Sequence, residues 1–255
     1  MKVSKNTPRG QKGENGRVLV VGGSKEYSGS VYLAAMAAAR SGADSVMVMA
    51  PEKVAWAINA LSPDLVTKKL KGRYLNASHR AEILHQLETA DVLLIGNGAG
   101  VKPQTARLIC SIVKTWQGLK VVDADAIKAL KDNLVQNAIL TPNPNEYRLL
   151  QEHNNLPALL EKNNVILLKG RPVKVLSYEE TTLKNIDLCL TKAGIGDIIA
   201  GLAAGFLAQS KNLRQSAIDA SRTVSEIGAR AIKKRGRFYM ASDLLGEVEK
   251  LKVTY

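Results

Sequence analysis

The stretch that decides the fold is RVLVVGGSKEYSGSVYLAAMAAARSGADSVMVMA, residues 17–50. Its first part, 17–23, is a Val-rich apolar segment closed by two glycines, which is typical of a buried strand. A polar loop follows, and the Ala-rich segment 30–43 then has the spacing of a helix. Residues 45–50 are a second short apolar segment. Strand, helix and strand in this order predict a βαβ unit with parallel strands.

The same alternation continues along the chain. Helical spacing covers 105–116, and further short apolar segments predict strands at 91–100, 120–125, 138–143 and 164–170. Residues 173–178 and the polar stretch after them predict an antiparallel addition to the sheet. The final third predicts three helices, at 194–210, 216–235 and 242–251. The expected fold is an α/β/α three-layer sandwich with a mostly parallel central sheet, built as a single domain over residues 1–255.

Composition excludes several classes of protein. Of the 255 residues, 45% are hydrophobic and 23% charged, as in soluble globular proteins. The two cysteines, Cys110 and Cys189, cannot form a disulfide scaffold, and no CxxC motif indicates structural zinc. No apolar segment approaches the ~20 residues of a membrane span, and the basic, polar N-terminus does not resemble a signal peptide. We expect a cytoplasmic protein without a membrane partner.

The charge balance favours anionic partners. The chain has 36 Lys and Arg residues against 23 Asp and Glu residues, a formal net charge of +13. Nucleotides, other phosphates or nucleic acid fit this charge, and a solvated basic surface is the alternative explanation. Aromatic residues make up only 4% of the chain, which leaves few platforms for stacking bases. Nucleic acid is therefore the weakest of these partners.

Polar and glycine-rich segments follow the predicted strands. In parallel sheets, ligands bind beyond the carboxyl ends of the strands. The segments at these ends carry the Gly, Asp, Asn, Glu and Lys side chains of a phosphate and magnesium site: VGGS (21–24), GNGAG (96–100), DAD (123–125), TPNPNE (141–146) and KGRP (169–172). Each segment alone is equally consistent with a tight turn or a helix cap, but five of them together favour a binding site.

The sharpest feature is AGIGDIIAGLAAG, residues 193–205. Gly194, Ile195 and Gly196 precede a predicted helix, whose free N–H groups and dipole favour an anion. Asp197 lies in the first turn. One interpretation is that Asp197 only complements the dipole; the other is that it is a base beside a phosphate, able to take a proton from an attacking hydroxyl.

Other singled-out residues have simpler explanations. Gly201 and Gly205 stand four residues apart on one helix face, which predicts close helix packing. His79, His85 and His153 match no motif, and we expect them to be surface or helix positions without a catalytic role.

Several motifs, in order along the chain, carry a resemblance to a known family. GIGD (194–197) resembles the GTGD anion hole of the ribokinase-like superfamily. QKGENGRVLVVGGSKEYSGSVYLAAMAAARSGADSV (11–46) is similar to HKGxxGxVLVxGGSxxYxGAxxLAAxAALRxGAGxV. The remaining segments resemble IGPGxG, VLDADAL and xLTPHPGExxRL in this chain's IGNGAG (95–100), VVDADAI (121–127) and ILTPNPNEYRLL (139–150). LLKG (167–170) and ASDLL (241–245) also match. Together they resemble the ADP/ATP-dependent NAD(P)H-hydrate dehydratase family, in its stand-alone form without an epimerase domain.

The resemblance implies an enzyme of metabolite repair, a lyase. It would dehydrate (6S)-NAD(P)H hydrate to NAD(P)H by phosphorylation of the ring hydroxyl and elimination of phosphate, with ADP or ATP and Mg²⁺ as cofactors. Asp197 would be the base, and the backbone N–H groups of Gly194, Ile195 and Gly196 would stabilise the transferred phosphoryl group. Family members commonly assemble as homotetramers, so a homo-oligomer is expected.

The resemblance also assigns ligand contacts by position. The nucleotide would contact Lys169, Gly170, Arg171, Pro172, Val173 and Gly196. The substrate would contact Ser30, Gly98, Gly100, Asn143 and Asp197. Mg²⁺ would be held by Glu146, through water, with Asp123 as a weaker candidate.

The chain departs from the family pattern around this site. Ser30 replaces an alanine, Asn143 a histidine, Asn145 a glycine and Ile195 a threonine, and KNIDLCL (184–190) replaces a TGNPG-like stretch. These differences leave two alternatives open. One is an ATP-dependent small-molecule kinase of the same superfamily, acting on a hydroxymethylpyrimidine- or hydroxyethylthiazole-like alcohol. The other is a non-catalytic nucleotide-binding protein or a basic nucleic-acid-associated protein.

Overall fold

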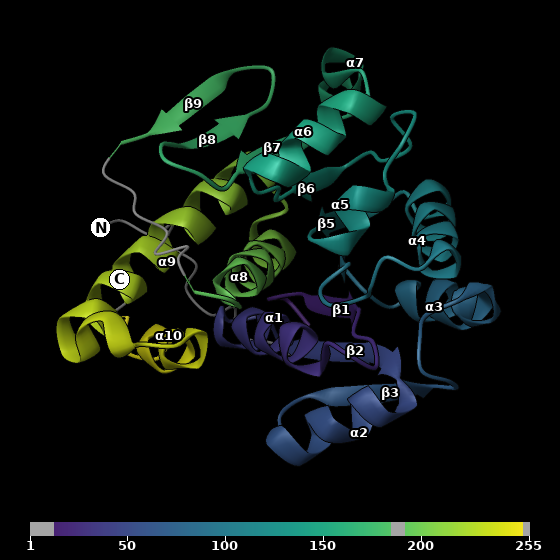
Figure 1. Cartoon of the computed structure of the whole chain (residues 1–255), viewed down its shortest axis with the longest axis horizontal. Coiled ribbons are helices and arrows are strands. Elements are labelled where there is room, and N and C mark those ends of the chain that lie inside the picture. Colours follow the sequence, from purple (N-terminus) through teal and green to yellow (C-terminus); the bar gives the residue numbers. More distant parts are fainter. Residues whose placement is uncertain (1–12, 185–191, 252–255) are drawn as a thin grey trace.

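A single nine-stranded sheet organises the protein in the computed structural model, which describes residues 13–184 and 192–251 (Figure 1). The strand order is β3-β2-β1-β4-β5-β6-β7-β8-β9. The strands are β1 (Arg17–Val21), β2 (Ser45–Pro51), β3 (Val66–Leu70), β4 (Val92–Ile95), β5 (Leu119–Val122), β6 (Ala138–Leu140), β7 (Val165–Leu168), β8 (Val173–Leu176) and β9 (Glu180–Leu183). Along this order, neighbouring strands from β3 to β7 pair in parallel. Strand β8 pairs antiparallel with both β7 and β9.

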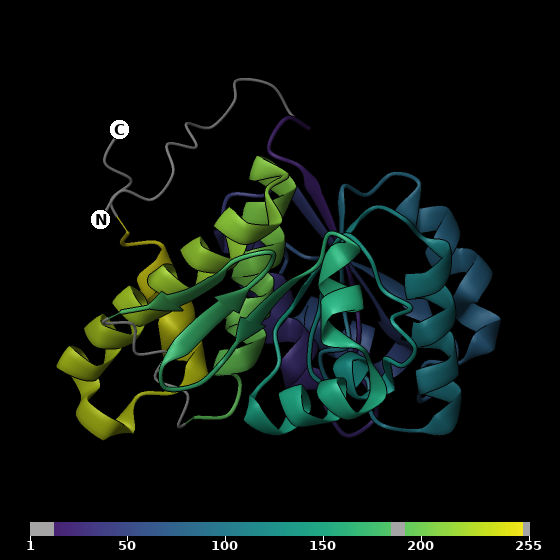
Figure 2. The same cartoon turned by 90° about the horizontal axis from the view of Figure 1, so that it is seen from above.

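Helices cover both faces of the sheet (Figure 2). One face packs against α1 (Ser28–Arg40), α2 (Glu52–Leu61), α8 (Ile195–Ser210), α9 (Leu213–Arg235) and α10 (Ala241–Val248). The other packs against α3 (Arg80–Leu87), α4 (Pro103–Thr115), α5 (Asp125–Ala129), α6 (Pro144–His153) and α7 (Leu156–Glu161). Short 3₁₀ turns lie at Ala77–His79 and Gly236–Phe238. The predicted three-layer α/β/α sandwich, with its antiparallel addition, is confirmed.

The two cores are separated by the pleat of the strands. Val18 and Val20 of β1 point into the α1–α8 side, whereas Leu19 and Val21 point into the α3–α4 side. Successive strand residues face opposite sides of a sheet, so a strand covered on both faces has to be apolar throughout. This requirement explains the continuous apolar segments that identified the strands in the sequence.

Helices α1 and α8 pack closely through glycine, as predicted. A Cβ atom on Gly201 would collide with the backbone carbonyl oxygen of Ala34, and one on Gly205 would collide with Ser41 and with the carbonyl oxygen of Ala38. The absence of side chains at these positions brings the two backbones together. Because both helices begin at the carboxyl ends of the strands, this contact also fixes the distance between their first turns.

Some boundaries differ from the prediction. The sequence did not predict β3, an edge strand in which Thr67, Lys68 and Lys69 interrupt the apolar pattern. The last helix begins at Ala241, before Ser242, because the Asp243 carboxylate accepts a hydrogen bond from the Met240 N–H at 2.8 Å and caps the helix.

Of the two positions expected for His79, surface or helix, the structure shows the second, in the 3₁₀ turn Ala77–His79. His79 is buried, with an exposed fraction of 4%. One ring nitrogen lies 3.2 Å from the Asn76 backbone N–H and the other 3.0 Å from the Lys71 carbonyl oxygen, so His79 links the turn before α3 to the end of β3.

Among residues 13–184 and 192–251, no helix is long and apolar enough to cross a membrane. Cys189 and most of the KNIDLCL stretch lie outside the described residues.

Candidate active site

The strand order reverses between β1 and β4, which places a crevice at their carboxyl ends. The loop after β4 enters this crevice through glycines with positive φ, Gly96 at +118° and Gly98 at +62°. A Cβ atom on Gly98 would lie 2.7 Å from the Tyr27 carbonyl oxygen. Gly98 therefore lets the loop after β4 approach the start of α1, while the N–H of Gly100 is held by the Asp125 carboxylate at 2.8 Å.

Asp197 stands in the first turn of α8 and faces this crevice. The helix is entered through Gly194, whose φ of +90° is in the left-handed region that glycine adopts without strain. The N–H groups of a first helical turn have no intrahelical partner and carry the positive end of the helix dipole. The sequence GIGD thus folds into a helix start whose free N–H groups lie beside the Asp197 carboxylate.

Two side chains from other elements hold the Asp197 carboxylate. The Ser30 hydroxyl, from the first turn of α1, donates to Asp197 Oδ1 at 2.5 Å. The side-chain amide of Asn97, from the loop after β4, donates to the same oxygen at 2.7 Å. Asn97 also donates to Asp123 Oδ2 at 3.0 Å, so its amide bridges the two carboxylates.

Lys169 brings a buried positive charge to the same place. Its Nζ lies 2.7 Å from Asp123 Oδ1, which also accepts a hydrogen bond from the Thr141 hydroxyl at 2.6 Å. Nζ would lie 3.2 Å from a Cβ atom on Gly196, so the ammonium group sits against the start of α8. The helix start and Lys169 together place positive charge next to Asp197.

Burial and a like charge set the protonation of Asp197. Loss of solvent, followed by repulsion from Asp123, raises the pKa of Asp197 to about 6, although hydrogen bonds from Ser30 and Asn97 and the charge of Lys169 lower it. A carboxylate with this pKa is ionised at neutral pH yet basic enough to accept a proton, which is the property of a general base.

Asn143 and Glu146 meet at the start of α6. The Asn143 carbonyl oxygen Oδ1 accepts the N–H groups of Asn145 and Glu146, both at 2.9 Å, and Glu146 Oε2 accepts the Asn143 N–H at 2.9 Å. This reciprocal capping box explains part of the local sequence without a ligand.

The residues present fit a magnesium ion held mainly by water and phosphate. Mg²⁺ commonly uses one or two carboxylates and keeps several waters, and the nearly buried Glu146 can supply one such carboxylate. Both oxygens of Asp123 already accept hydrogen bonds, and a lysine ammonium is its nearest charge. Asp123 is thus a poorer ligand candidate than Glu146. Within the described parts of the chain, no three His, Cys, Asp or Glu side chains gather into a ready-made metal site.

The predicted nucleotide segment lies next to the start of α6. The Lys169 backbone N–H donates to the Pro142 carbonyl oxygen at 2.9 Å, and a Cβ atom on Gly170 would lie 3.9 Å from the Pro144 ring. Residues 170–172 form the turn between β7 and β8, and Val173 begins β8. From this segment, Lys169 extends its side chain to Asp123.

Asn97 and Ser24 are site residues that sequence reasoning missed. Both are wholly buried at the strand-order reversal, and Asn97 Oδ1 and Ser24 Oγ have no hydrogen-bond partner within the described chain. Buried polar atoms of this kind normally bond to a ligand or an ordered water. The available signal was the position of each residue, directly after a glycine at a strand end.

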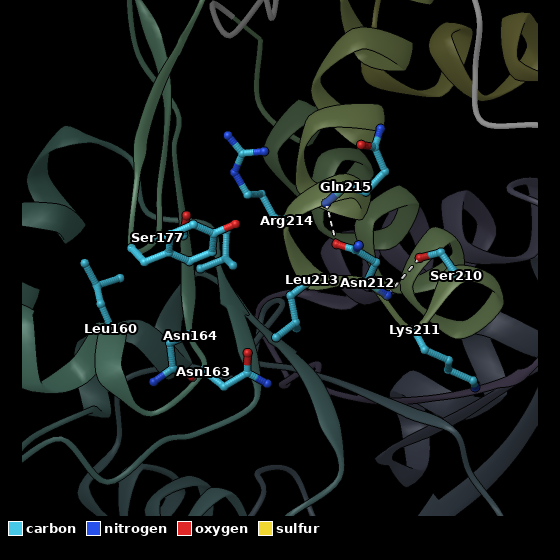
Figure 3. Close-up of a pocket in the computed structure, with 12 residues that line it drawn as sticks. Leu160, Asn163, Asn164, Ser177, Ser210, Lys211, Asn212, Leu213, Arg214 and Gln215 are labelled. Carbon is cyan, nitrogen blue, oxygen red and sulfur yellow. Dashed lines mark hydrogen bonds between the residues drawn. The ribbon is translucent and has the colours of Figure 1, made fainter.

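A cavity of about 560 Å³ lies away from this site (Figure 3). It opens where Ser210–Gln215 join α8 to α9, opposite Asn163 and Tyr178. Because Asp197 is at the other end of α8, about 20 Å along a helix of this length, this cavity is separate from the residues described above. Its size alone does not make it the functional site.

A family model described as NAD(P)H-hydrate dehydratase matches residues 18–250, which include every residue of the site above. The chain belongs to the NAD(P)H-hydrate dehydratase family. A relative of similar length is the "ADP-dependent (S)-NAD(P)H-hydrate dehydratase" of Cenarchaeum symbiosum, 32% identical over 92% of this chain and 87% of that protein. The "Bifunctional NAD(P)H-hydrate repair enzyme Nnr" of Methanothermobacter thermautotrophicus is 33% identical over 96% of this chain and 51% of that protein. The family member described here spans about half the length of such bifunctional relatives.

Solved structures confirm the ribokinase-like fold of this dehydratase-family chain. The ADP/ATP-dependent NAD(P)H-hydrate dehydratase of Bacillus subtilis, co-crystallised with ATP and Mg²⁺, superposes with a TM-score of 0.77. It covers 98% of this chain and 94% of its own at 20% sequence identity. At this identity, the similarity establishes the shared fold.

Proposed function

We propose that the protein restores NAD(P)H from (6S)-NAD(P)H hydrate in a reaction that consumes ADP or ATP. One observation carries the proposal: the Asp197 carboxylate, with a pKa raised to about 6, stands at the start of α8 beside the buried ammonium group of Lys169. This arrangement offers a base for a hydroxyl and a positive site for a phosphoryl group within one crevice. The family membership and the names of the relatives supply the substrate.

The reaction begins with proton removal. Asp197 takes the proton from the ring hydroxyl of the hydrate, and the oxygen then attacks the terminal phosphoryl group of the nucleotide. The N–H groups at the start of α8, from Gly194 to Gly196, and the Lys169 ammonium stabilise the negative charge on the transferred group. The transfer breaks the bond to the terminal phosphoryl group and releases AMP from ADP or ADP from ATP. Phosphate then leaves from the ring carbon, a proton leaves the neighbouring ring carbon, and the double bond of the dihydronicotinamide is restored.

The other predicted contacts surround these two residues. We assign the turn from Gly170 to Val173 to the nucleotide, and Gly98, Gly100 and Asn143 to the dinucleotide substrate. Glu146 would help to hold Mg²⁺, and the bound ion would neutralise phosphate charge. The capping box orients the Glu146 carboxylate for this task, because one of its oxygens is fixed by the Asn143 N–H.

The decisive experiment follows the return of dihydronicotinamide absorbance from hydrated NADH or NADPH with Mg²⁺ and either ADP or ATP. We expect turnover by the wild type and a loss of about 10²-fold to 10⁴-fold in Asp197→Asn, since the base is removed. The faster nucleotide identifies the phosphoryl donor. Asp219→Asn is the matched control, because it also replaces a nearly buried carboxylate, on α9, and should leave turnover unchanged.

The other outcomes separate the alternatives. A stable phosphorylated product from a small alcohol, without recovery of absorbance from the hydrate, would identify a kinase of the same fold. Tight nucleotide binding that is unchanged in Asp197→Asn, with no turnover of any substrate, would identify a non-catalytic nucleotide-binding protein. Either result would refute the proposal that the protein is a dehydratase.

We also propose a homotetramer in the cytoplasm. Trp56, Leu61 and Val66 are more than half exposed on α2 and β3, at the open edge of the sheet, which supports burial in an assembly. Light scattering after size-exclusion chromatography tests the oligomeric state.

Cys110 is a free thiol, which fits a reducing compartment.

A further inference from the structure

Two residues that differ from the family pattern form hydrogen bonds to the same atom, Asp197 Oδ1. The family opening has alanine at the position of Ser30, and the family segment IGPGxG has proline at the position of Asn97. Neither alanine nor proline has a side chain that can donate a hydrogen bond. In this protein Ser30 and Asn97 both donate to Asp197 Oδ1, at 2.5 and 2.7 Å.

We propose that Ser30 and Asn97 are positioning residues that together fix Asp197 Oδ1, so that Oδ2 is the oxygen that takes the proton from the substrate hydroxyl. The proposal rests on the proposed function for the identity of the substrate. It concerns the orientation and basicity of Asp197, which can be measured without any substrate.

The geometry determines which way the Asn97 amide points. Its Nδ2 group has two hydrogens, and each is directed to a carboxylate: one to Asp197 Oδ1 and one to Asp123 Oδ2. Reversing the amide would place Oδ1 of Asn97 against two negative charges, which is repulsive. The donor side of Asn97 is therefore committed to the two carboxylates. The acceptor side is buried and has no partner among residues 13–184 and 192–251.

The two donors come from opposite directions in the fold. Ser30 belongs to α1, which α8 contacts through Gly201 and Gly205, and Asn97 belongs to the glycine-rich loop after β4. Two donors anchored on separate elements prevent rotation of the carboxylate about its last torsion. Because Oδ1 accepts both hydrogen bonds, the lone pairs of Oδ2 are left for the reacting hydroxyl.

Donors to the ionised form also lower the pKa of a carboxyl group. Burial and the neighbouring Asp123 raise the pKa of Asp197, while Ser30, Asn97 and Lys169 oppose them. Asp123 and Lys169 are the charged groups that face Asp197, and both remain when the two donors are removed. Loss of Ser30 or Asn97 should therefore leave a less acidic Asp197 in an otherwise unchanged charge environment.

The test compares Ser30→Ala, Asn97→Ala and the double variant with the wild type. A hydrogen bond to a charged group corresponds to a shift of about one pKa unit. We expect the Asp197 carboxyl to titrate about one unit higher in each single variant, and higher still in the double variant. ¹³C NMR of protein labelled at the aspartate carboxyl carbon measures this, with Asp197→Asn identifying the resonance. The acid limb of kcat/KM against pH should move in the same direction, and kcat should fall.

Controls separate this role from a general loss of structure. Ser30→Ala removes a single oxygen and restores the family residue, so it should fold. Ser221→Ala removes a buried hydroxyl on α9 that donates to the Ala217 carbonyl oxygen at 2.9 Å, and it should leave the Asp197 titration unchanged. Ser30→Thr keeps the hydroxyl and should restore the wild-type titration.

Unchanged Asp197 titrations in Ser30→Ala and Asn97→Ala would overturn the proposal, whatever happens to turnover. Shifted titrations in a protein that turns over no hydrate would support the positioning of Asp197 while refuting the dehydratase, so the two failures are distinguishable. A fall in kcat with an unmoved acid limb would show that the two residues act only through structure, and would also refute the proposal.

Discussion

The ammonium group of Lys169 lies 2.7 Å from Asp123 Oδ1, and the two side chains are almost completely buried, with exposed fractions of 7% and 2%. Lys169 also reaches the start of α8, where its Nζ would lie 3.2 Å from a Cβ atom on Gly196. Asp123 therefore anchors the cation that lies beside the start of α8. A buried ion pair of this kind is costly to break, because the remaining charge has lost its solvent and its partner.

We expect Lys169→Met to lower the free energy of unfolding by about 3–5 kcal/mol, because it leaves the Asp123 carboxylate buried and uncompensated. Urea unfolding monitored by circular dichroism measures this value. The double variant Lys169→Met/Asp123→Asn removes both charges and should recover most of the loss. Both variants should lose turnover, since each lacks the cation that the proposed reaction places next to the transferred phosphoryl group.

Lys174→Met is the control for this experiment. Lys174 pairs with Glu180 at 2.8 Å, but both side chains are more than a third exposed. Solvent screens an exposed pair, so it contributes little to stability, and this variant should unfold near the wild type. Equal losses in Lys169→Met and in the double variant would show that packing of the lysine stem, and not the stranded charge, causes the effect.

Gly201→Ala tests the contact between α1 and α8. The new methyl group would collide with the Ala34 backbone oxygen, so the helices must separate, and we expect a loss of about 1–3 kcal/mol. Turnover should fall as well, because α1 carries Ser30 and α8 carries Asp197. Gly246→Ala on α10 is the control: nothing lies within 4 Å of its Cβ position, and alanine favours a helix by up to about 1 kcal/mol. A stabilising Gly201→Ala would contradict the packing described here.

The layered fold was predictable because of the demands of a buried parallel sheet. Strands such as Val92–Ile95 are covered on both faces, so each forms a continuous apolar segment that is visible in the sequence. The edge strand Val66–Leu70 was missed because only one neighbour pairs with it and its lysines remain partly exposed. Local sequence does not distinguish such a strand from a loop.

The candidate site was predictable only in part. Asp197 stands in a compact motif, whereas its partners lie far away in the sequence: Ser30 is 167 residues from Asp197, and Asn97 is 100 residues from it. The carboxyl ends of strands meet at one edge of the sheet, which predicts the neighbourhood of these residues. Which side chains touch depends on the packing of α1 against α8 and on the positive φ at Gly96 and Gly98, and no local pattern specifies that outcome.

Lys120 on β5 provides a prediction away from the site. It is fully buried, its Nζ donates to the Gln136 carbonyl oxygen at 2.6 Å, and burial lowers its pKa to about 8. The folded protein therefore binds this proton less tightly than the unfolded chain does. The cost of burying the charged ammonium group is present in full below about pH 8. The free energy of unfolding recovers as the pH rises from about 8 towards 10.5.

Lys120→Met removes this penalty but also the hydrogen bond to Gln136. We expect the free energy of unfolding to rise by about 1–3 kcal/mol at pH 7 and by clearly less at pH 9.5. Urea unfolding at the two pH values gives both differences, with the exposed Lys174→Met as the reference. A variant that is less stable than the wild type at pH 7 would show that the hydrogen bond of Lys120 outweighs its desolvation.

Asp197→Asn should separate stability from activity in a pH-dependent way. The pKa of Asp197 is raised from 3.8 to about 6 on folding, chiefly by burial. The folded protein thus holds this proton more tightly than the unfolded chain. The stability that the protonated Asp197 contributes is fully present below about pH 4 and is lost as the pH rises through about 6. At pH 8 the ionised carboxylate costs up to about 3 kcal/mol, and neutral asparagine avoids this cost while its carbonyl oxygen still accepts from Ser30 and Asn97.

We therefore expect Asp197→Asn to be more stable than the wild type at pH 8, with a difference that shrinks towards zero at pH 4.5, and to be inactive at both. Urea unfolding at the two pH values measures the differences. Asp64→Asn replaces an exposed carboxylate and should change the free energy of unfolding by less than about 0.5 kcal/mol at either pH. A difference that is the same at pH 4.5 and 8 would mean that Asp197 does not gain proton affinity on folding. The proposed reaction accounts for this destabilising charge, because an ionised, weakly solvated carboxylate is what proton removal at neutral pH requires.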